Sequence, residues 1–277
     1  THEAVYETQV TPHCCLETHG CVAEFEGENL TVWYSTQGIW NVQRSCASAG
    51  RVSSSQTRII TQHMGGGFGS KLQAEEFCGL CIQMAKETGR PVKLMANRYE
   101  DIVMCGNKPG AIMSVRIGAT NDGDIRSVGV DARAIVGYTG SGGIAGPFYD
   151  NYDISNVSVS ESTVRLNAGA PRPFRAPGRP QGAFGLEMAI EELAFKLKID
   201  PFELRLKNVS SDELDARVHE MNVGAERFGW KDKYRPHGTD TGPIRRGVGC
   251  ALTAWPYNAG IGSATARCTL FPDGSVE

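Results

Sequence analysis

The chain has 277 residues, a formal net charge of −3, and charged side chains at 21% of its positions. This length is sufficient to bury a sizeable core in one large or two modest domains. Nucleic-acid-binding proteins normally carry a basic excess, which is missing here, so we expect no nucleic-acid partner. No apolar run approaches membrane-spanning length and no signal peptide leads the chain, so we expect no membrane partner.

The cysteines indicate a reducing environment. There are nine, an odd number, so at least one cannot form an internal disulfide. Most lie in apolar runs, where cysteine acts as a small hydrophobic residue. Cys78 and Cys81 have the spacing of a redox or metal pair, but both fall on a predicted helix with no second pair nearby. We therefore predict a cytoplasmic location, and we find no cluster of metal-ligating residues in the sequence.

Strand and helix signals alternate irregularly in the first part of the chain. Leu30, Val32 and Tyr34 alternate with other residues and so share one face of a predicted strand. A glycine and a proline, Gly89 and Pro91, end the helix that follows. The predicted elements are a strand at 30–35, a helix at 73–88 and a strand at 92–96.

The second part contains the clearest hairpin, two apolar runs joined by Asn121-Asp122-Gly123-Asp124. A later helix carries leucine and isoleucine at helical spacing, which buries one face. The next helix has a complete start signal, with Asp200 as N-cap, Pro201 at the first position and Glu203 at the third. The predicted elements are strands at 112–120, 125–136 and 154–164, a helix at 182–197, and a helix that begins after Asp200.

These elements predict an α+β fold with mixed sheets and packed helices. Beyond Asn208 the chain turns polar until Gly247, so we place one domain at 1–208 and a linker with the truncated start of a second domain at 209–277. A strand predicted at 264–271 is followed by a turn and only a few residues of a return strand. A hairpin cut there would leave its ladder unpaired, so we expect an internal piece of a longer polypeptide.

The most informative motif is the glycine run HMGGGFGSK at residues 63–71. Glycines let backbone approach a ligand closely, and Ser70 with Gln73 fits a capping box at the start of the next helix. Free N–H groups at that helix N-terminus would suit a phosphorylated or oxo-anionic ligand. A tight strand-to-helix turn explains the glycines equally well.

Spacing excludes two familiar phosphate-binding motifs. A P-loop needs lysine directly after its last glycine, and Ser70 stands before Lys71. The dinucleotide fingerprint needs a third glycine where Ser70 is. A nearer match at residues 140–145 follows a strand but then meets Gly146-Pro147 and a polar, tyrosine-containing stretch instead of a helix. We interpret it as a flexible glycine loop.

A second motif, APRPFRAPGRPQG, occupies residues 170–182. Proline and glycine stiffen this loop, which carries three arginines and leads into the helix of Glu187. Taken alone, it is either an anion-binding loop or a solvated basic turn. Two short segments complete the set, LETHG at 16–20 and STQG at 35–38, which lie before and after the first strand.

These four segments, in this order, closely resemble the molybdenum-binding large subunit of the xanthine oxidase and aldehyde oxidase family. The resemblance covers essentially the whole chain and implies that 1–208 is a first molybdopterin-binding domain, with the start of the second after it. It implies a cofactor in which the dithiolene of a pterin, often extended to a cytosine dinucleotide, holds the molybdenum. No protein side chain then ligates the metal.

The resemblance also implies roles for individual residues. Gln37 would hydrogen-bond a molybdenum oxo group through its side-chain amide, backbone amides at Phe68 and Gly69 would approach the cofactor, and Arg175 and its neighbours would frame the site. An amide N–H donates without adding charge, glycine permits close approach, and arginine stabilises anionic oxygens. Gln37 and Arg175 are the expected catalytic residues. The expected cofactor-binding residues are Gln37, Gly66, Gly67, Phe68, Gly69, Phe174 and Arg175.

The reaction implied is hydroxylation of an aldehyde or N-heteroaromatic carbon with water as the oxygen source. Electrons would pass to iron–sulfur clusters and FAD on partner domains or subunits. The expected partners are a small-molecule substrate, the remaining half of the molybdenum subunit, and these electron-transfer components. Two alternatives stay open: a non-catalytic module that binds a nucleotide or pterin, and a purely structural α+β domain.

Departures from the family pattern bear on activity and substrate. The general-base glutamate lies beyond Glu277 in the family, so we expect the segment alone to be inactive. Purine-hydroxylating members carry a glutamate where this chain has Leu72, and an arginine that would fall in the 140–146 loop, which has none. The 172–182 loop also lacks the cysteine of a carbon monoxide dehydrogenase. We therefore predict a substrate less polar than a purine.

Overall fold

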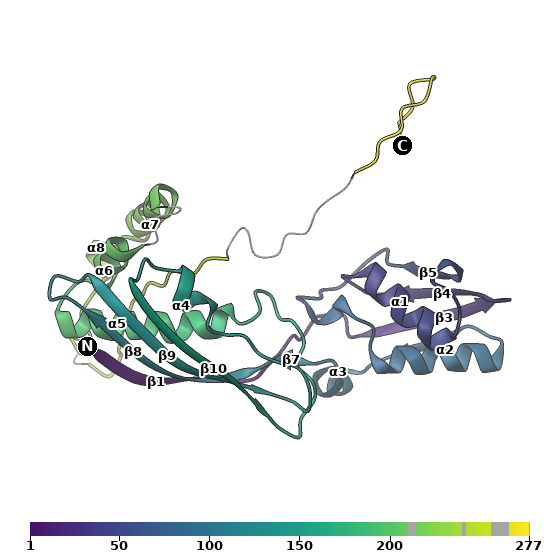
Figure 1. The fold of residues 1–277 in the computed structure, drawn as a ribbon, viewed down its shortest axis with the longest axis horizontal. Helices are drawn as coiled ribbons and strands as arrows, with labels where there is room; N and C mark the ends of the chain where they lie inside the picture. The colour runs from purple at the N-terminus through teal and green to yellow at the C-terminus, as the bar shows by residue number, and fades with distance from the viewer. Residues whose placement is uncertain (210–213, 240–241, 256–265, 277) are drawn as a thin grey trace.

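The computed structural model describes residues 1–209, 214–239, 242–255 and 266–276. Two four-stranded sheets organise residues 1–209 into two lobes that lie side by side (Figure 1). The first sheet has the order β1-β8-β9-β10, and the second has the order β5-β4-β3-β6. The α+β class with mixed sheets is therefore confirmed, because each sheet contains antiparallel pairs and one parallel pair.

The first sheet is built on the predicted hairpin. Its antiparallel strands carry buried alternate residues toward helix α5 (Arg179–Leu197), whose leucines and isoleucine pack against them. Helix α6 (Pro201–Asn208) packs on α5, and the Asp200 carboxylate caps it by accepting from the Phe202 N–H at 2.7 Å, as predicted. The strands are β1 (His2–Thr8), β8 (Gly110–Ala119), β9 (Ile125–Val136) and β10 (Asn156–Arg165).

The second sheet is covered by two helices, α1 (Ile39–Gly50) and α2 (Glu76–Thr88) (Figure 1). Leu30, Val32 and Tyr34 are buried in this core, which confirms the alternation predicted from the sequence. The strands are β3 (Gly20–Glu26), β4 (Asn29–Tyr34), β5 (Thr57–Ile60) and β6 (Val92–Met95).

Short elements connect the lobes and shape the loops between them. A two-residue pairing of β2 with β7 and helix α3 lie at the junction (Figure 1). Within the described residues, no helix combines the length and apolar character needed to span a bilayer. The short elements are β2 (Thr11–Pro12), η1 (Ser54–Gln56), η2 (Ser70–Leu72), α3 (Arg98–Met104), β7 (Asn107–Lys108) and α4 (Gly146–Asp150).

The helix behind the glycine run starts later than predicted. It begins at Glu76 with Glu75 as N-cap, so the predicted capping box at Ser70 is wrong. Ser70 instead opens the 3₁₀ turn η2, where its hydroxyl donates to the Gly67 carbonyl at 2.8 Å. The α2 N-terminus therefore does not follow directly on the glycine run, and the anion binding expected at that terminus stays a prediction.

Two further predictions need correction. The glycine loop at 140–145 does lead into a helix, the five-residue α4, in which proline occupies the first turn. The segment after Asn208 is helical where we expected a linker, with α7 (Leu214–Phe228) and α8 (Trp230–Lys233). The buried Trp230 indole donates to Asp200 at 3.1 Å, which ties α8 to the start of α6. The 208/209 domain boundary stays a prediction.

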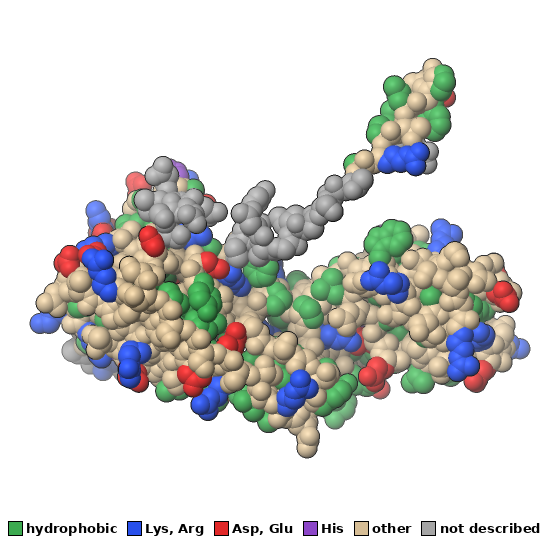
Figure 2. All heavy atoms as spheres, viewed as in Figure 1, with side chains coloured by type: hydrophobic (Ala, Val, Ile, Leu, Met, Phe, Trp, Pro, Cys, Tyr) green, Lys and Arg blue, Asp and Glu red, His purple; other side chains and the backbone are tan. Residues whose placement is uncertain are grey.

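The predicted C-terminal strand, 264–271, begins outside the described residues. In the part that is described, one isolated bridge joins Leu270 to Val276 across the predicted turn. Figure 2 shows Lys and Arg side chains interspersed with Asp and Glu over the viewed face.

Candidate functional site

The glycine run fixes the side chain of Gln37, which follows β4. The Gly69 N–H donates to Gln37 Oε1 at 2.7 Å, and the Gln37 N–H donates to the Lys71 carbonyl at 2.9 Å. A Cβ on Gly67 would lie 2.5 Å from Gln37 Oε1, so glycine is required there. Because Oε1 is occupied, the Nε2 amino group is the end of the exposed Gln37 side chain that remains for a ligand.

The arginine loop docks on the same run. The Arg175 N–H donates to the Phe68 carbonyl at 2.8 Å. Gly69 has a φ of 106°, and a Cβ there would lie 2.3 Å from the Pro173 carbonyl oxygen. The two motifs, far apart in the sequence, are therefore one packed unit, and the structure brings Gln37 and Arg175 to the same place.

The three arginines of this loop have different roles. Arg172 donates to Glu75 at 2.9 Å and to Gln73 at 2.7 Å, and Arg179 makes two bonds of 2.5 Å to Asp150. Arg175 is exposed, and its guanidinium has no hydrogen bond or ion pair within the described ranges. Only Arg175 is thus free to contact an anionic ligand.

Phe174 belongs to a cavity wall. Its ring stacks on His13 with centroids 4.5 Å apart, and Lys108 Nζ lies 5.5 Å from its centroid. The cavity, of about 190 Å³, lies between the arginine loop and the 140–145 loop. A Cβ on Gly178 would come within 1.7 Å of the Gly143 carbonyl oxygen, so the two loops pack tightly against each other.

An ion pair between the buried Lys71 and the half-buried Glu17 anchors the glycine run from below. Lys71 is fully buried, and its Nζ donates to Glu17 Oε2 at 2.8 Å and to Ser35 Oγ at 3.1 Å. Burial raises the pKa of Glu17, but hydrogen bonds from Lys71, Ser35 and the Gly65 N–H outweigh it and hold that pKa below its ordinary value. Lys71 is therefore a structural anchor and has no free charge for a ligand.

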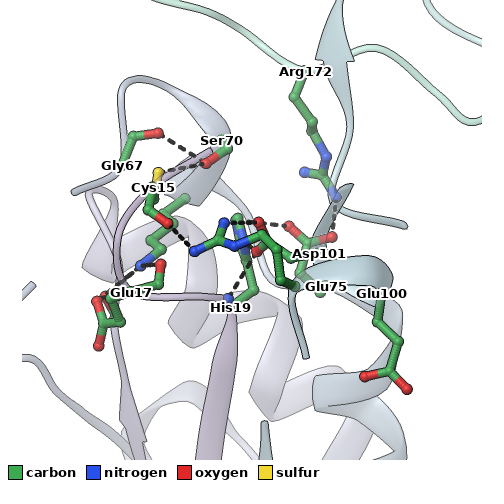
Figure 3. Close-up of polar contacts among 12 residues, drawn as sticks. Cys15, Glu17, His19, Gly67, Ser70, Glu75, Glu100, Asp101 and Arg172 are labelled. Carbon is green, nitrogen blue, oxygen red and sulfur yellow. Dashed lines mark hydrogen bonds and ion pairs between the residues drawn. The ribbon is translucent and has the colours of Figure 1, made fainter. Parts of the chain in front are cut away.

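Beneath this anchor lies a second polar layer (Figure 3). Asp101 Oδ1 accepts from His19 Nδ1 at 2.6 Å, and Arg98 donates to Asp101 Oδ2 at 2.8 Å. Glu75 connects the layer to the arginine loop through Arg172. Burial raises the pKa of Glu75 to about 7, although the adjacent Arg172 guanidinium lowers it.

The family model described as the molybdopterin cofactor-binding domain matches residues 1–209. The chain belongs to this family. It is 30% identical to the aldehyde oxidoreductase molybdenum-binding subunit PaoC of Escherichia coli O157:H7, over 99% of this chain and 39% of that protein. It is 28% identical to the xanthine dehydrogenase molybdenum-binding subunit of the same organism, over 98% of this chain and 39% of that protein.

Solved structures of two oxidoreductases share the fold. Quinoline 2-oxidoreductase from Pseudomonas putida 86 superimposes with a TM-score of 0.78 at 20% identity, over 83% of this chain and 32% of that one. Aldehyde oxidoreductase from Desulfovibrio gigas gives a TM-score of 0.72 at 21% identity, over 84% of this chain and 28% of that one. The chain thus spans about two-fifths of the curated relatives and about a third of these structures.

The residues of this molybdopterin-binding domain fit such a cofactor. The Gln37 amino group is a neutral donor, Arg175 is an unpaired cation, and the Phe68 N–H makes no hydrogen bond to any described residue. Glycine at 67 and 69 allows these groups to stand close together. The Gly69 amide differs from expectation, because it holds Gln37 and so acts through that side chain. The roles of Gly66 and Phe174 stay predictions.

Sequence reasoning missed the supports under the site. It singled out segment 16–20 but gave no role to Glu17 or His19, which anchor Lys71 and contact Asp101. It also missed that Glu75 binds Arg172. The sequence contained one signal for these supports. Lys71 stands beside the glycine run, and its spacing had already excluded the role of a P-loop lysine.

Proposed function

We propose that the chain forms one side of the cofactor site in a molybdenum-dependent hydroxylase that oxidises an aldehyde or N-heteroaromatic carbon. The observation that carries the proposal is the fixed amide of Gln37 next to the unpaired Arg175. When bound, the cofactor would supply hydroxylation with oxygen from water and pass electrons onward. The chain's own residues would bind the cofactor, orient it and exclude competing contacts.

Each residue's part follows from its contacts. The bond from the Gly69 N–H to Gln37 Oε1 orients the Gln37 amino group, which would donate to an oxygen ligand of the metal without adding charge. The Phe68 N–H would donate to the pterin from the same loop. Arg175 would stabilise negative charge on the cofactor or on the reacting oxygen. The general base would come from the remaining part of the molybdenum subunit.

The proposal extends to the form of the cofactor and to the partners. The cofactor would be bound either as molybdopterin itself or as its cytosine dinucleotide. Iron–sulfur and flavin domains or subunits would accept the electrons, in the cytoplasm. The described cysteines are all free, which agrees with a reducing compartment. A non-catalytic pterin-binding module is the weaker alternative, because the relatives with matching sequence are named as oxidoreductase or dehydrogenase subunits.

Leu72 favours a substrate that is less polar than a purine. This residue is half-buried, and its carbonyl oxygen would lie 2.8 Å from a Cβ on Gly38, directly beside Gln37. An apolar side chain there cannot satisfy the N–H and C=O groups of a purine edge, and unpaired buried groups cost about 1–3 kcal/mol each. A less polar aldehyde or N-heteroaromatic avoids that cost.

The test is Gln37→Ala in the intact enzyme, with turnover expressed per bound molybdenum. Losing one positioned donor typically lowers turnover about 10²–10³-fold, whereas cofactor content should fall much less. Gln62→Ala is the matched control, since Gln62 is exposed in the same region and has no hydrogen bond among the described residues. Wild-type turnover per molybdenum in Gln37→Ala would refute the role of Gln37.

A further inference from the structure

Three potential metal ligands converge beneath the glycine run. His19 directly precedes β3, Glu75 is the N-cap of α2, and Cys105 is the C-cap of α3. All three residues are buried, and their donor atoms lie within 4.8 Å of one another. The residues come from three separate segments, so no local sequence spacing could reveal the group.

Two of the donor atoms have no partner. His19 Nε2 and Glu75 Oε1 are buried without a hydrogen bond to any described residue. They are 3.8 Å apart, which is too long for a hydrogen bond between them. The two side chains are 2% and 5% exposed, so water does not reach them freely. Buried polar atoms are nearly always satisfied in folded proteins, so two unpaired polar atoms that face each other require an explanation.

The surroundings orient these atoms as a metal site would need. Asp101 holds His19 Nδ1 at 2.6 Å and is itself held by Arg98, so the lone pair of His19 Nε2 points into the group (Figure 3). Glu75 Oε2 is fixed by Arg172, which leaves Oε1 free. A carboxylate behind a histidine ligand is the usual outer support of zinc sites.

We propose that His19 Nε2, Glu75 Oε1 and Cys105 Sγ bind one divalent ion of the zinc class, with water as the fourth ligand. Ligand distances of about 2.0–2.3 Å in a tetrahedron place donor atoms about 3.3–3.8 Å apart. The 3.8 Å between His19 Nε2 and Glu75 Oε1 already fits, and the other separations, all within 4.8 Å, need a contraction of about 1 Å at most. One nitrogen, one oxygen and one sulfur donor suit zinc or cobalt and do not suit magnesium or calcium.

Binding must release protons, which sets its pH dependence. A free cysteine thiol is ordinarily protonated at neutral pH, so Cys105, which lies near the Glu75 and Asp101 carboxylates, must lose its proton to bind the ion. The ion would replace that proton, which passes to solvent, and the thiolate and the Glu75 carboxylate would then offset its two positive charges. The affinity should therefore rise with pH. The other charged groups that act on this site are the cations Lys71, Arg98 and Arg172, and the carboxylate Glu76.

An ion here would also stiffen the cofactor side. It would fix Glu75, and Glu75 holds Arg172, the first arginine of the loop that presents Arg175. The divalent-ion site and the proposed molybdenum chemistry can be tested separately, because molybdenum and zinc are measured as separate elements.

The experiment uses the intact molybdenum subunit, freed of divalent ions with a chelator and then titrated with Co²⁺ and Zn²⁺. We expect one Co²⁺ per chain with a thiolate-to-cobalt charge-transfer band, displaced by one Zn²⁺. Cys105→Ala should lose the band and weaken Zn²⁺ binding at least about tenfold. Cys46→Ala is the matched control, a buried cysteine outside the group, and should keep both.

Two results would overturn the proposal. One is a wild-type protein without the thiolate band at one equivalent of Co²⁺, which would mean that Cys105 does not bind the ion. The other is a band that survives in Cys105→Ala. Should Cys105→Ala fail to fold, Glu75→Gln gives the same decision, since an amide in place of the carboxylate should weaken Zn²⁺ binding while the thiolate band shifts.

Discussion

Replacing Gly69 with alanine tests whether the two motif loops act as one unit. Two costs can be estimated from the structure. A φ of 106° is unfavourable for alanine by about 1–2 kcal/mol. The new Cβ would also lie 2.3 Å from the Pro173 carbonyl oxygen, so the arginine loop must move and lose its hydrogen bond from Arg175 to Phe68, worth about 1 kcal/mol.

Gly89→Ala is the matched control for this prediction. Gly89 also has a positive φ, 61°, but a Cβ there meets nothing within 4 Å. Its cost should be the backbone term alone, about 1 kcal/mol. Urea denaturation of the 277-residue chain should therefore show that Gly69→Ala loses at least about 1 kcal/mol more of the free energy of unfolding. Equal losses in the two variants would refute the reasoning that the loops support each other.

Three more predictions follow from the site and its surroundings. The 277-residue chain expressed alone should carry no molybdenum and no hydroxylase activity, because the rest of the pocket is missing; near-stoichiometric molybdenum by mass spectrometry would contradict this. The intact enzyme should prefer an aromatic aldehyde or N-heterocyclic carboxylate over xanthine by tenfold or more in kcat/KM, about 1.4 kcal/mol, and xanthine as the best substrate in steady-state assays would refute the role of Leu72. In chelator-treated protein, the pKa of Glu75 is raised to about 7 from an ordinary 4.5, so between these pH values the folded state binds more protons than the unfolded state. The free energy of unfolding should therefore fall as pH rises through this window. Urea denaturation of Glu75→Gln should show a shallower fall, and identical pH slopes would contradict the shift.

Local signals predicted most of the fold. The alternation of Leu30, Val32 and Tyr34, the hairpin around the 121–124 turn and the Asp200 cap all depend on neighbours in the sequence, and all are present in the structure. The start of α2 was wrong because Ser70 has a stronger local partner, the Gly67 carbonyl, than the helix that follows. The helix α7 was missed because its composition is polar.

The site divides in the same way. Gln37, the glycine run and Arg175 were identified because the motifs resemble a family, and the structure places them together. The supports beneath them depend on pairs far apart in the chain, such as His19 with Asp101 and Arg172 with Glu75. No periodicity in the sequence links such residues, so these pairs could be identified only from the three-dimensional structure.

A structure of the intact, cofactor-loaded molybdenum subunit would show directly whether Gln37 contacts the metal's oxygen ligand. We expect Gln37 Nε2 to lie within about 2.7–3.2 Å of an oxygen ligand of the molybdenum while its Oε1 keeps the bond from the Gly69 N–H. Arg175 should face the same group. A pterin bound away from Gln37 and the 66–69 loop, or a Gln37 side chain turned away from the metal, would contradict the account.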